Sequence, residues 1–451
     1  MRNSFVKKMA LALVGTMVIG SLAGCGEKEV VESNPVTSET VEENVVSETE
    51  VAEPTLKELD WEDVEFRVAW NGNDVRNNNF LNVIEEFESD YNNLFVTAEF
   101  AAWSQYKSRI STQAAGNQLP DVLIMDYSFF KDYDDGGLLL PLNDYIESGA
   151  LDLSNVGAND IASGTLDGDI VAIPLGSNAP CFAYDPAILE KSSVTMSEAP
   201  TLEEFTEVAK AVYDATGAKV YPATGIDLFV RQVGAQFIGD DGKSVGFTAE
   251  QAAEYYNWYY EGVEYGYIID LHNMPTPDVG LADGTYWAAW MWSNNFAPNQ
   301  AAAGKELGLI PMPTLEGAEP ATYLKPTLFW SVAASSENPD LAVEFLNYYF
   351  NDKGVWDVVG TECGVPINAD AKAYVGRSLE GVDKQVLEFI AWLGDADKVS
   401  PIEPPTPAAA AEVKTLFMNI RDKIGLREMK KDDIVSEIDK AIKASNEILS
   451  K

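Results

Sequence analysis

The chain has 451 residues and a formal net charge of −41, with 72 Asp and Glu against 31 Lys and Arg. It lacks the basic surplus that nucleic-acid binding needs, which excludes nucleic acid as an expected partner. A single histidine, His272, leaves almost no imidazole chemistry, and no Cys/His spacing suits zinc, so we expect no metal site and no cofactor.

The first 24 residues have the pattern of a secretory signal peptide. Lys7 and Lys8 precede an apolar stretch from Met9 to Ala23, too short to span a membrane. The stretch ends in Leu-Ala-Gly-Cys (22–25), which resembles the bacterial lipobox, whose cysteine receives a diacylglyceryl group. Two acyl chains suffice for stable anchoring. We therefore expect lipidation at Cys25; the alternative is an ordinary signal peptide with an incidental cysteine.

Residues 25–60 are expected to form a disordered acidic tether. From Gly26 to Asp60 there is no aromatic residue, and glutamates recur throughout. Such a segment cannot bury enough apolar surface to offset its chain entropy, and its like charges extend it. The signal and tether place the protein on the outer face of a bacterial cell membrane, and the tether's length favours a Gram-positive envelope.

The start of the folded body alternates strands and helices. Apolar alternation predicts a strand over 64–70, and helical spacing predicts a helix over 79–89. A strand over 94–96, a helix ending near 115–116 and a buried strand over 120–126 follow. This βαβαβ order predicts an α/β fold with a mostly parallel sheet covered by helices on both faces. Ligands bind beyond the carboxyl ends of such strands.

Later helices are indicated by their caps. Capping boxes begin at Thr201 and Thr248, and Asn338-Pro339 is expected to open a helix reaching Phe350. A last helix is expected over 434–449. The aromatic side chains of 255–260 are expected to lie mainly in the core.

The cysteines and one serine motif were considered for chemistry. A disulfide between Cys181 and Cys363 is allowed by the composition but not required. Residues 242–246 match Gly-x-Ser-x-Gly, but the preceding Gly-Asp-Asp indicates a surface hairpin turn instead of a nucleophile elbow. We expect no catalytic residues and no enzyme activity.

An ordered series of motifs resembles extracellular solute-binding proteins of family 1, the sugar-binding subunits of ABC importers, which include the maltose-binding proteins. The motifs cover the chain from about residue 64 onward. They occupy residues 103–110, 115–122, 137–142, 167–174, 237–242, 309–313, 331–335 and 338–346. Tyr184-Asp185 departs from the family's usual Tyr-Asn.

The resemblance implies a two-lobe, periplasmic-binding-protein-like fold of type II, with a ligand cleft between lobes joined by about three hinge crossings. The crossings are expected near 175–182, 308–312 and 328–331. The implied N-terminal lobe comprises 61–177 and 309–329, and the C-terminal lobe comprises 178–308 and 330–451. Hinge closure would trap ligand and present the closed form to a membrane permease.

Candidate ligand contacts are aromatic and polar residues at the expected strand ends and crossings. Aromatic faces suit sugar rings, while Asp, Asn and Glu suit sugar hydroxyls. The candidates are Trp70, Asn71, Asn73, Asp126, Tyr127, Asn178, Asp227, Phe229, Trp292, Asn294, Asn295, Trp330 and Glu362. Trp103 is expected to be structural because it belongs to the signature motif.

The expected function is therefore capture of a carbohydrate, with an oligosaccharide favoured, by a monomeric lipoprotein that delivers it to ABC permease subunits. Two alternatives stay open. Paired carboxylates could make a surface glycoside-active enzyme, because Asp and Glu occur throughout the chain. The same fold could also bind a peptide, polyamine or metal complex.

Overall fold

The computed structural model describes residues 57, 64–223, 225–394, 398–407 and 409–451. The expected signal peptide, Cys25 and, apart from Lys57, the tether lie outside the described residues. Within the described part, no helix combines the length and apolar character needed to cross a membrane.

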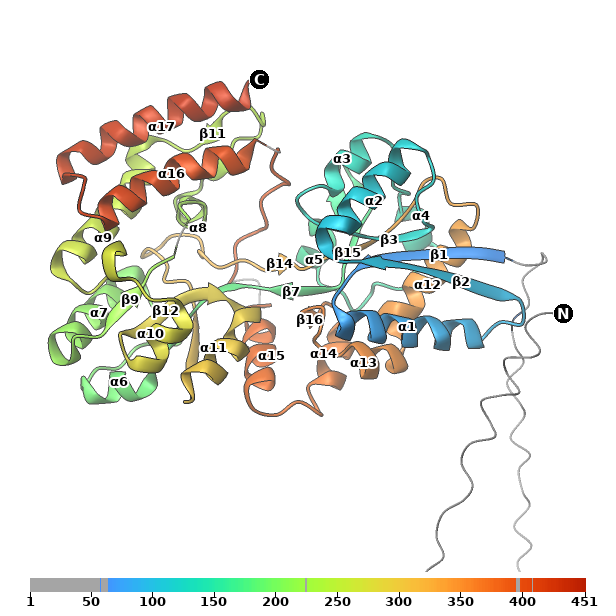
Figure 1. Ribbon diagram of the computed structural model, residues 1–451, viewed down its shortest axis with the longest axis horizontal. Coiled ribbons are helices and arrows are strands. Elements are labelled where there is room, and N and C mark those ends of the chain that lie inside the picture. The colour runs from blue at the N-terminus through green and yellow to red at the C-terminus, as the bar shows by residue number, and fades with distance from the viewer. Residues whose placement is uncertain (1–56, 58–63, 224, 395–397, 408) are drawn as a thin grey trace, which may run out of the picture. The chain divides into compact units, whose positions relative to one another are not determined.

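The first sheet has five strands in the order β2-β1-β3-β15-β6. Its strands are β1 (Val64–Asn71), β2 (Leu94–Ala101), β3 (Val122–Met125), β6 (Ile173–Pro174) and β15 (Phe329–Val332). β1 pairs in parallel with β2 and β3, whereas β15 is antiparallel to both β3 and β6. Helices α1 (Asp74–Ser89) and α2 (Trp103–Ala115) lie on opposite faces of β1 and β2 (Figure 1). The predicted βαβαβ unit is confirmed.

Helix α1 begins five residues earlier than its apolar spacing indicated. The side chain of Asn73 accepts a hydrogen bond from the backbone N–H of Arg76 and so caps the helix. Phe80, Ile84 and Phe87 then face the first core. The early start brings the first turn of α1 directly to the carboxyl end of β1.

The second sheet has four strands in the order β13-β8-β12-β9. Its strands are β8 (Pro180–Tyr184), β9 (Lys219–Tyr221), β12 (Tyr286–Trp292) and β13 (Gly308–Pro311). The helices along this part of the chain include α7 (Leu202–Thr216), α9 (Ala249–Tyr265), α10 (Pro277–Asp283) and α11 (Phe296–Ala303). Thr248 and Gln251 form the full capping box that the sequence predicted for α9.

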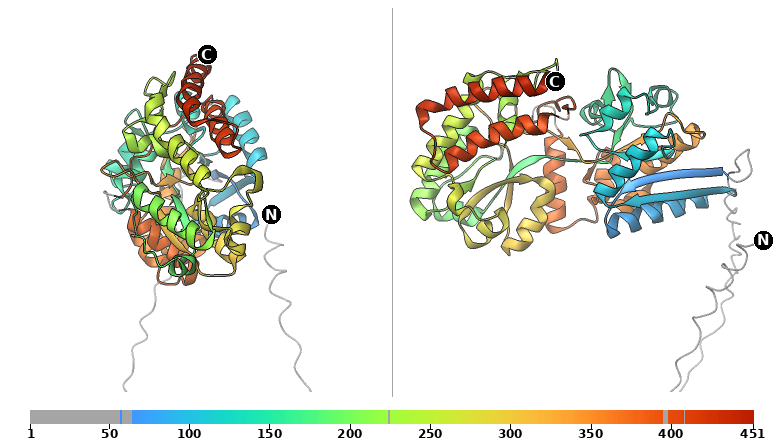
Figure 2. Two further views of the ribbon diagram at one scale, coloured as in Figure 1. Left: turned by 90° about the vertical axis from the view of Figure 1, so that its left-hand side faces the viewer. Right: turned by 45° about the horizontal axis from the view of Figure 1, so that its top comes forward.

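The core around α9 has the aromatic character expected from the sequence. Tyr255, Tyr256 and Tyr259 are buried, whereas Trp258 and Tyr260 are only partly buried against the same cluster. Helices α16 (Ala410–Gly425) and α17 (Ile434–Leu449) lie side by side over this core (Figures 1 and 2), where the Tyr256 hydroxyl donates to the backbone carbonyl of Phe417. The expected last helix is confirmed.

A small third sheet, β14-β7-β16, joins the two larger ones. β7 (Gly176–Asn178) lies between β14 (Lys325–Pro326) and β16 (Val365–Pro366), and in the chain it directly links β6 of the first sheet to β8 of the second. Gly176 leaves no room for a side chain, because an added Cβ would lie 2.5 Å from the carbonyl oxygen of Cys363.

Strand pairing corrects the expected division of the chain after residue 308. β13 pairs with β8 in the second sheet, although 309–329 was assigned to the first lobe. β15 pairs with β3 in the first sheet, and α12 (Pro339–Asn351) buries Phe345 in the first core, although 330–451 was assigned to the second lobe. The crossings were implied by the family resemblance, which does not specify which sheet each short strand joins in this chain.

The remaining elements lie around these sheets. They are α3 (Phe130–Asp135), α4 (Asn143–Glu147), α5 (Ala158–Ser163), β4 (Thr165–Leu166), β5 (Asp169–Ile170), α6 (Pro186–Lys191), α8 (Asp227–Val230), β10 (Gln236–Ile238), β11 (Val245–Gly246), α13 (Lys353–Val359), α14 (Ala369–Val375) and α15 (Gly381–Leu393). β10 and β11 are antiparallel, with Gly242 at φ +63° between them, so the Gly-x-Ser-x-Gly match lies in the expected hairpin.

Candidate functional site

A cavity of about 750 Å³ opens where strand ends of the first and second sheets meet the third sheet. Asn71 ends β1, Trp292 ends β12, and Asn178 ends β7 at this cavity. Side chains from β14 and from the loop between α13 and β16 complete the wall. The cavity therefore lies at the strand-end position where α/β folds place ligands.

Most of the sequence-predicted contacts are brought together here. The cavity is lined by Asn71, Asn73, Asp126, Asn178, Trp292, Asn294, Asn295 and Glu362. Five of these are asparagines, whose amides both donate and accept hydrogen bonds. The side-chain oxygen of Asn71 is buried and has no hydrogen-bond partner among the described residues.

Two predicted tryptophans lie in the core instead. Trp70 is 0% exposed, and its indole N–H donates to Asn77 Oδ1 at 2.9 Å. Trp330 is 1% exposed, with its ring 5.4 Å from Phe80 and 5.6 Å from Tyr349. The prediction that these two rings reach the cleft is wrong, because both strands are covered by helices and the indoles fill the interior.

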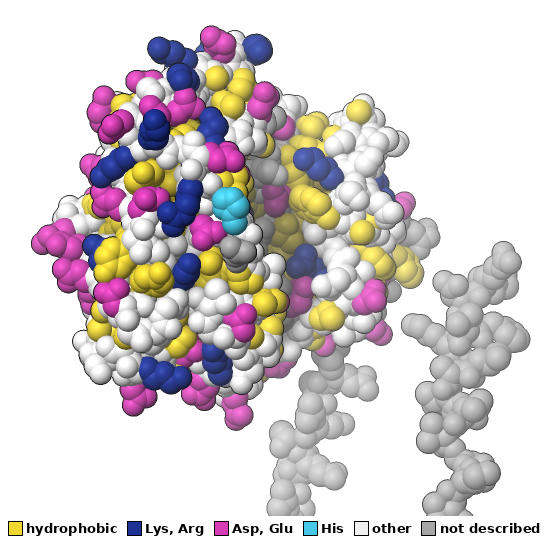
Figure 3. Space-filling view, turned by 60° about the vertical axis from the view of Figure 1, so that its left-hand side comes forward, with side chains coloured by type: hydrophobic (Ala, Val, Ile, Leu, Met, Phe, Trp, Pro, Cys, Tyr) yellow, Lys and Arg dark blue, Asp and Glu magenta, His cyan; other side chains and the backbone are white. Residues whose placement is uncertain are grey.

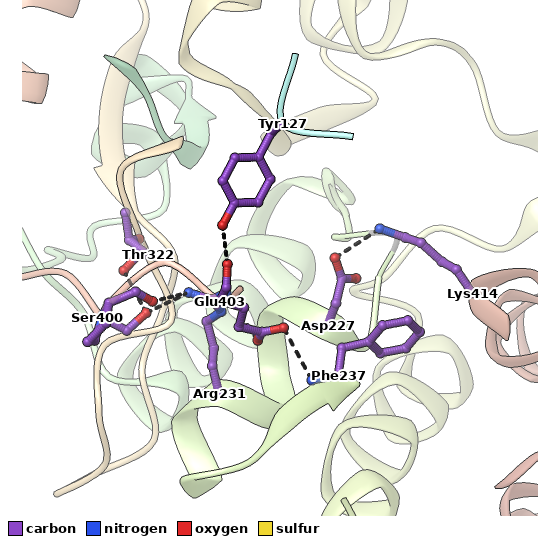
Figure 4. Close-up of polar contacts among 9 residues, drawn as sticks. Tyr127, Asp227, Arg231, Phe237, Thr322, Ser400, Glu403 and Lys414 are labelled. Atoms are coloured by element: carbon purple, nitrogen blue, oxygen red, sulfur yellow. Dashed lines mark hydrogen bonds and ion pairs between the residues drawn. The ribbon is translucent and has the colours of Figure 1, made fainter. Parts of the chain in front are cut away.

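Tyr127, Asp227 and Phe229 also lie outside this cavity. Figure 4 draws the network of polar contacts to which Tyr127 and Asp227 belong, and Phe229 lies in the second core. The Tyr127 hydroxyl donates to the backbone carbonyl of Glu403, and Asp227 Oδ2 lies 2.9 Å from Lys414 Nζ. Phe229 packs 5.7 Å from Tyr255 in the second core.

Arg231 and Glu403 form the centre of that network. Arg231 Nη2 lies 3.1 Å from Glu403 Oε1, and its Nη1 donates to Ser400 Oγ at 2.8 Å (Figure 4). Burial raises the pKa of the Glu403 carboxyl, and the nearby Arg231 guanidinium opposes that rise. The side chains predicted to face ligand are thus held by partners distant in sequence.

Three residues that line the cavity were not among the ligand contacts predicted from the sequence: one aromatic and two basic side chains. Trp103, expected to be structural, is 40% exposed and lines the cavity from the first turn of α2. Arg76 reaches it from the first turn of α1, and Lys325 from β14. The strand-end rule could have identified Trp103 and Arg76, since β2 and β1 end just before them. Nothing local in the sequence places Lys325 at the site.

Arg76 and Glu362 form an ion pair in the cavity wall. Arg76 Nε lies 2.9 Å from Glu362 Oε2, and Arg76 Nη1 donates to the carbonyl of Asn71 at 3.2 Å. The Cys363 thiol donates to the same Glu362 oxygen at 3.1 Å. Burial raises the pKa of the Cys363 thiol, so it stays protonated at neutral pH.

The residues considered for a disulfide, for imidazole chemistry and for a metal site are not placed for these roles in the described part of the chain. Cys181 and Cys363 are buried free thiols, not a disulfide. His272 is exposed. It is the single histidine of the chain and therefore the cyan side chain in Figure 3, with charged side chains around it. Among the described residues, no group of three or more His, Cys, Asp or Glu is placed to hold a metal ion.

Comparison with known proteins identifies the family and the fold. Residues 82–412 match the family described as bacterial extracellular solute-binding protein. An extracellular solute-binding protein family 1 from Alicyclobacillus acidocaldarius superposes with a TM-score of 0.78 at 22% identity, covering 87% of this chain and 100% of its own.

Two further solved structures share the fold. A periplasmic oligogalacturonide binding protein from Yersinia enterocolitica has a TM-score of 0.72 at 21% identity, covering 86% of this chain and 99% of its own. The cyclic alpha-maltosyl-1,6-maltose binding protein from Arthrobacter globiformis has a TM-score of 0.69 at 20% identity, covering 86% and 99%.

The chain belongs to the bacterial extracellular solute-binding proteins, because the family match spans most of its length. The family resemblance seen in the sequence and the α/β solute-binding fold are confirmed. The family is extracellular and binds solutes.

Proposed function

We propose that this protein is the substrate-binding lipoprotein of an ABC importer and that its ligand is a carbohydrate. The observation that carries the proposal is the cavity wall itself, where the partly buried indole of Trp292 stands beside Asn178, Asn294 and Asn295. An aromatic face with amides around it matches the apolar ring faces and hydroxyl rim of a sugar. Solved proteins of this fold are named for oligogalacturonide and maltosyl-maltose binding.

The volume and shape of the site favour an oligosaccharide. A cavity of about 750 Å³ falls within the range of ~300–1,000 Å³ usual for small-molecule sites and has room for more than one sugar ring. It is walled by segments of all three sheets, so one ligand can contact groups that follow β1, β7 and β12 at once.

Delivery to a permease requires a change that the membrane partner can sense. We propose that the regions around the first and second sheets act as two lobes and rotate about the connections next to β7, β13 and β15. A few element-terminal residues can absorb such a rotation. Closure on ligand would bring the Trp292 wall toward the Asn71 wall, and permease subunits would recognise the closed form.

We further propose a monomer anchored through a lipid on Cys25, with residues 26–60 as a tether outside a Gram-positive cell membrane. The support is the sequence pattern at 2–25 and the acidic composition that follows.

A thermal-shift screen of the mature protein against mono- and oligosaccharides tests the proposal. A ligand that binds only the native state raises the melting temperature by mass action. We expect at least one saccharide to do so. If instead only a peptide or a polyamine raises it, the carbohydrate proposal fails while the fold stands.

The same saccharide, incubated with the protein and then analysed by chromatography, tests the enzyme alternative. We expect it to be recovered intact. Steady conversion to shorter sugars would make the cavity carboxylates catalytic and would contradict a binding role.

A further inference from the structure

Lys325 lines the cavity, and its ammonium group forms no ion pair with a carboxylate among the described residues. Its Nζ lies 5.0 Å from the centroid of the Trp292 ring, and its residue is exposed to the cavity. Among the described residues it takes part in no ion pair. Its backbone is fixed, because β14 pairs Lys325 with Asn178 of β7. A fixed main chain therefore presents this charge beside the aromatic wall.

The other charged groups of the cavity have protein partners or are exposed to solvent. The Arg76 guanidinium is neutralised by Glu362. Oδ1 of Asp126 accepts hydrogen bonds from the backbone and hydroxyl of Ser128. Asp383 is exposed in the first turn of α15, where the helix dipole favours a carboxylate. Lys325 is thus the one cavity cation in the described chain without a protein counter-charge.

A cavity lysine without an ion pair in the described chain is unexpected in a protein with so large a negative net charge. A net charge of −41 opposes the approach of anions at long range, so surface charge gives no general attraction for them. A cavity cation that forms no ion pair with a carboxylate of the described residues therefore points to a group on the ligand. Lysine offers a point charge that suits a single carboxylate.

We propose that the ligand is an acidic saccharide whose uronate carboxylate binds the ammonium of Lys325 while its ring contacts Trp292. The inference rests on the carbohydrate function proposed above and narrows its substrate class. The asparagine amides bind hydroxyls, which neutral and acidic sugars share, so Lys325 is the residue that discriminates between them. A uronate carboxylate and the lysine ammonium form a charge-assisted hydrogen bond, which is stronger than a neutral one.

Calorimetric titration with matched ligands tests the inference. The probes are oligomers of galacturonate, glucuronate and mannuronate, each next to its methyl ester, which keeps the sugar but removes the charge. We expect at least one acid to bind roughly tenfold to hundredfold more tightly than its ester, and the preference to weaken as salt is raised.

Variants assign that preference to a residue. Lys325→Met should abolish the difference between acid and ester, whereas Lys325→Arg should retain most of it. Lys210→Met is the matched control, because Lys210 lies 5.7 Å from the Tyr265 ring but does not line the cavity. It removes the same charge and the same kind of aromatic contact, and should keep the wild-type preference.

The outcomes separate the two proposals. Binding of neutral oligosaccharides with no acid preferred over its ester would overturn the acidic-ligand inference and leave the carbohydrate function standing. An acid preference that survives in Lys325→Met would overturn the role of Lys325. Failure of every saccharide, neutral or acidic, would overturn both.

Discussion

Arg76 and Glu362 stand 286 positions apart in the chain, yet Arg76 Nε lies 2.9 Å from Glu362 Oε2 in the cavity wall. The pair joins the first turn of α1 to the loop that follows α13. Both side chains are mostly buried, so each charge depends on the other for solvation. The pKa of Arg76 is raised above its ordinary value: burial opposes the charge, while the hydrogen bond and the charge of Glu362 favour it. The Arg76–Glu362 ion pair therefore stabilises this wall of the cavity in the absence of a ligand.

Replacing one partner of this pair should destabilise the fold. Glu362→Gln leaves the guanidinium of Arg76 buried without a counter-charge, which typically costs about 1–3 kcal/mol. Urea unfolding of the variant should show this loss. The double variant Arg76→Met/Glu362→Gln should recover part of it, because no unpaired charge remains. Unchanged stability in Glu362→Gln would mean that the pair is not formed in solution.

Trp292 and Trp330 were both predicted from the sequence to contact ligand, but replacing them should affect stability differently. Trp330→Ala empties a site that is 1% exposed, and such changes typically cost about 3–5 kcal/mol. Trp292→Ala removes a ring from the cavity wall and should lower ligand affinity with a much smaller effect on melting. Thermal unfolding of both variants is the measurement. Equal melting temperatures would place Trp330 outside the core.

Asp160 should make stability fall as pH rises. Burial raises the pKa of its carboxyl above the ordinary 3.8, although the Ser177 hydroxyl, 2.8 Å away, opposes the rise. Below 3.8 both folded and unfolded states are protonated. At higher pH the unfolded state ionises first, so ionisation favours unfolding until the folded pKa is passed.

Asp160→Asn is the corresponding variant, since its amide oxygen still accepts the Ser177 hydroxyl. Compared with wild type, it should become relatively more stable between pH 3.8 and neutrality. Urea unfolding at both ends of that range measures the difference. A gap between the two proteins that does not change with pH would contradict the raised pKa.

The membrane anchor can be tested with a single substitution at Cys25. Cys25→Ser removes the sulfur atom to which the proposed diacylglyceryl group would be attached. The protein should therefore move from the membrane to the medium or soluble fraction. Detergent partition of wild type and variant shows which. Retention of Cys25→Ser in the membrane would reject a lipid at this residue.

Much of the fold could be predicted from local pattern. The alternation of Val64, Phe66 and Val68 identified β1, and the Thr248 box identified the start of α9, because these signals depend on neighbours in sequence. The lobe assignment of β13 and β15 failed because each is a short apolar run. Its sheet is decided by partners more than a hundred residues away, β8 and β3.

The cavity was predictable to the extent that strand ends define it. Asn71, Asp126 and Trp292 follow or end strands and line it as expected. Tyr127 and Asp227 have similar local settings but are held by Glu403 and Lys414. Those contacts come from the last fifth of the chain and leave no local trace, and the same holds for the pairing of Lys325 with Asn178.

Calorimetric titration of wild type and Trp292→Ala with the best saccharide from the thermal-shift screen tests the central claim most directly. We predict one-site binding to wild type and roughly tenfold or greater weakening in Trp292→Ala, with melting preserved in the ligand-free variant. Wild-type affinity in Trp292→Ala, or no binding heat from any saccharide, would contradict a carbohydrate site in this cavity.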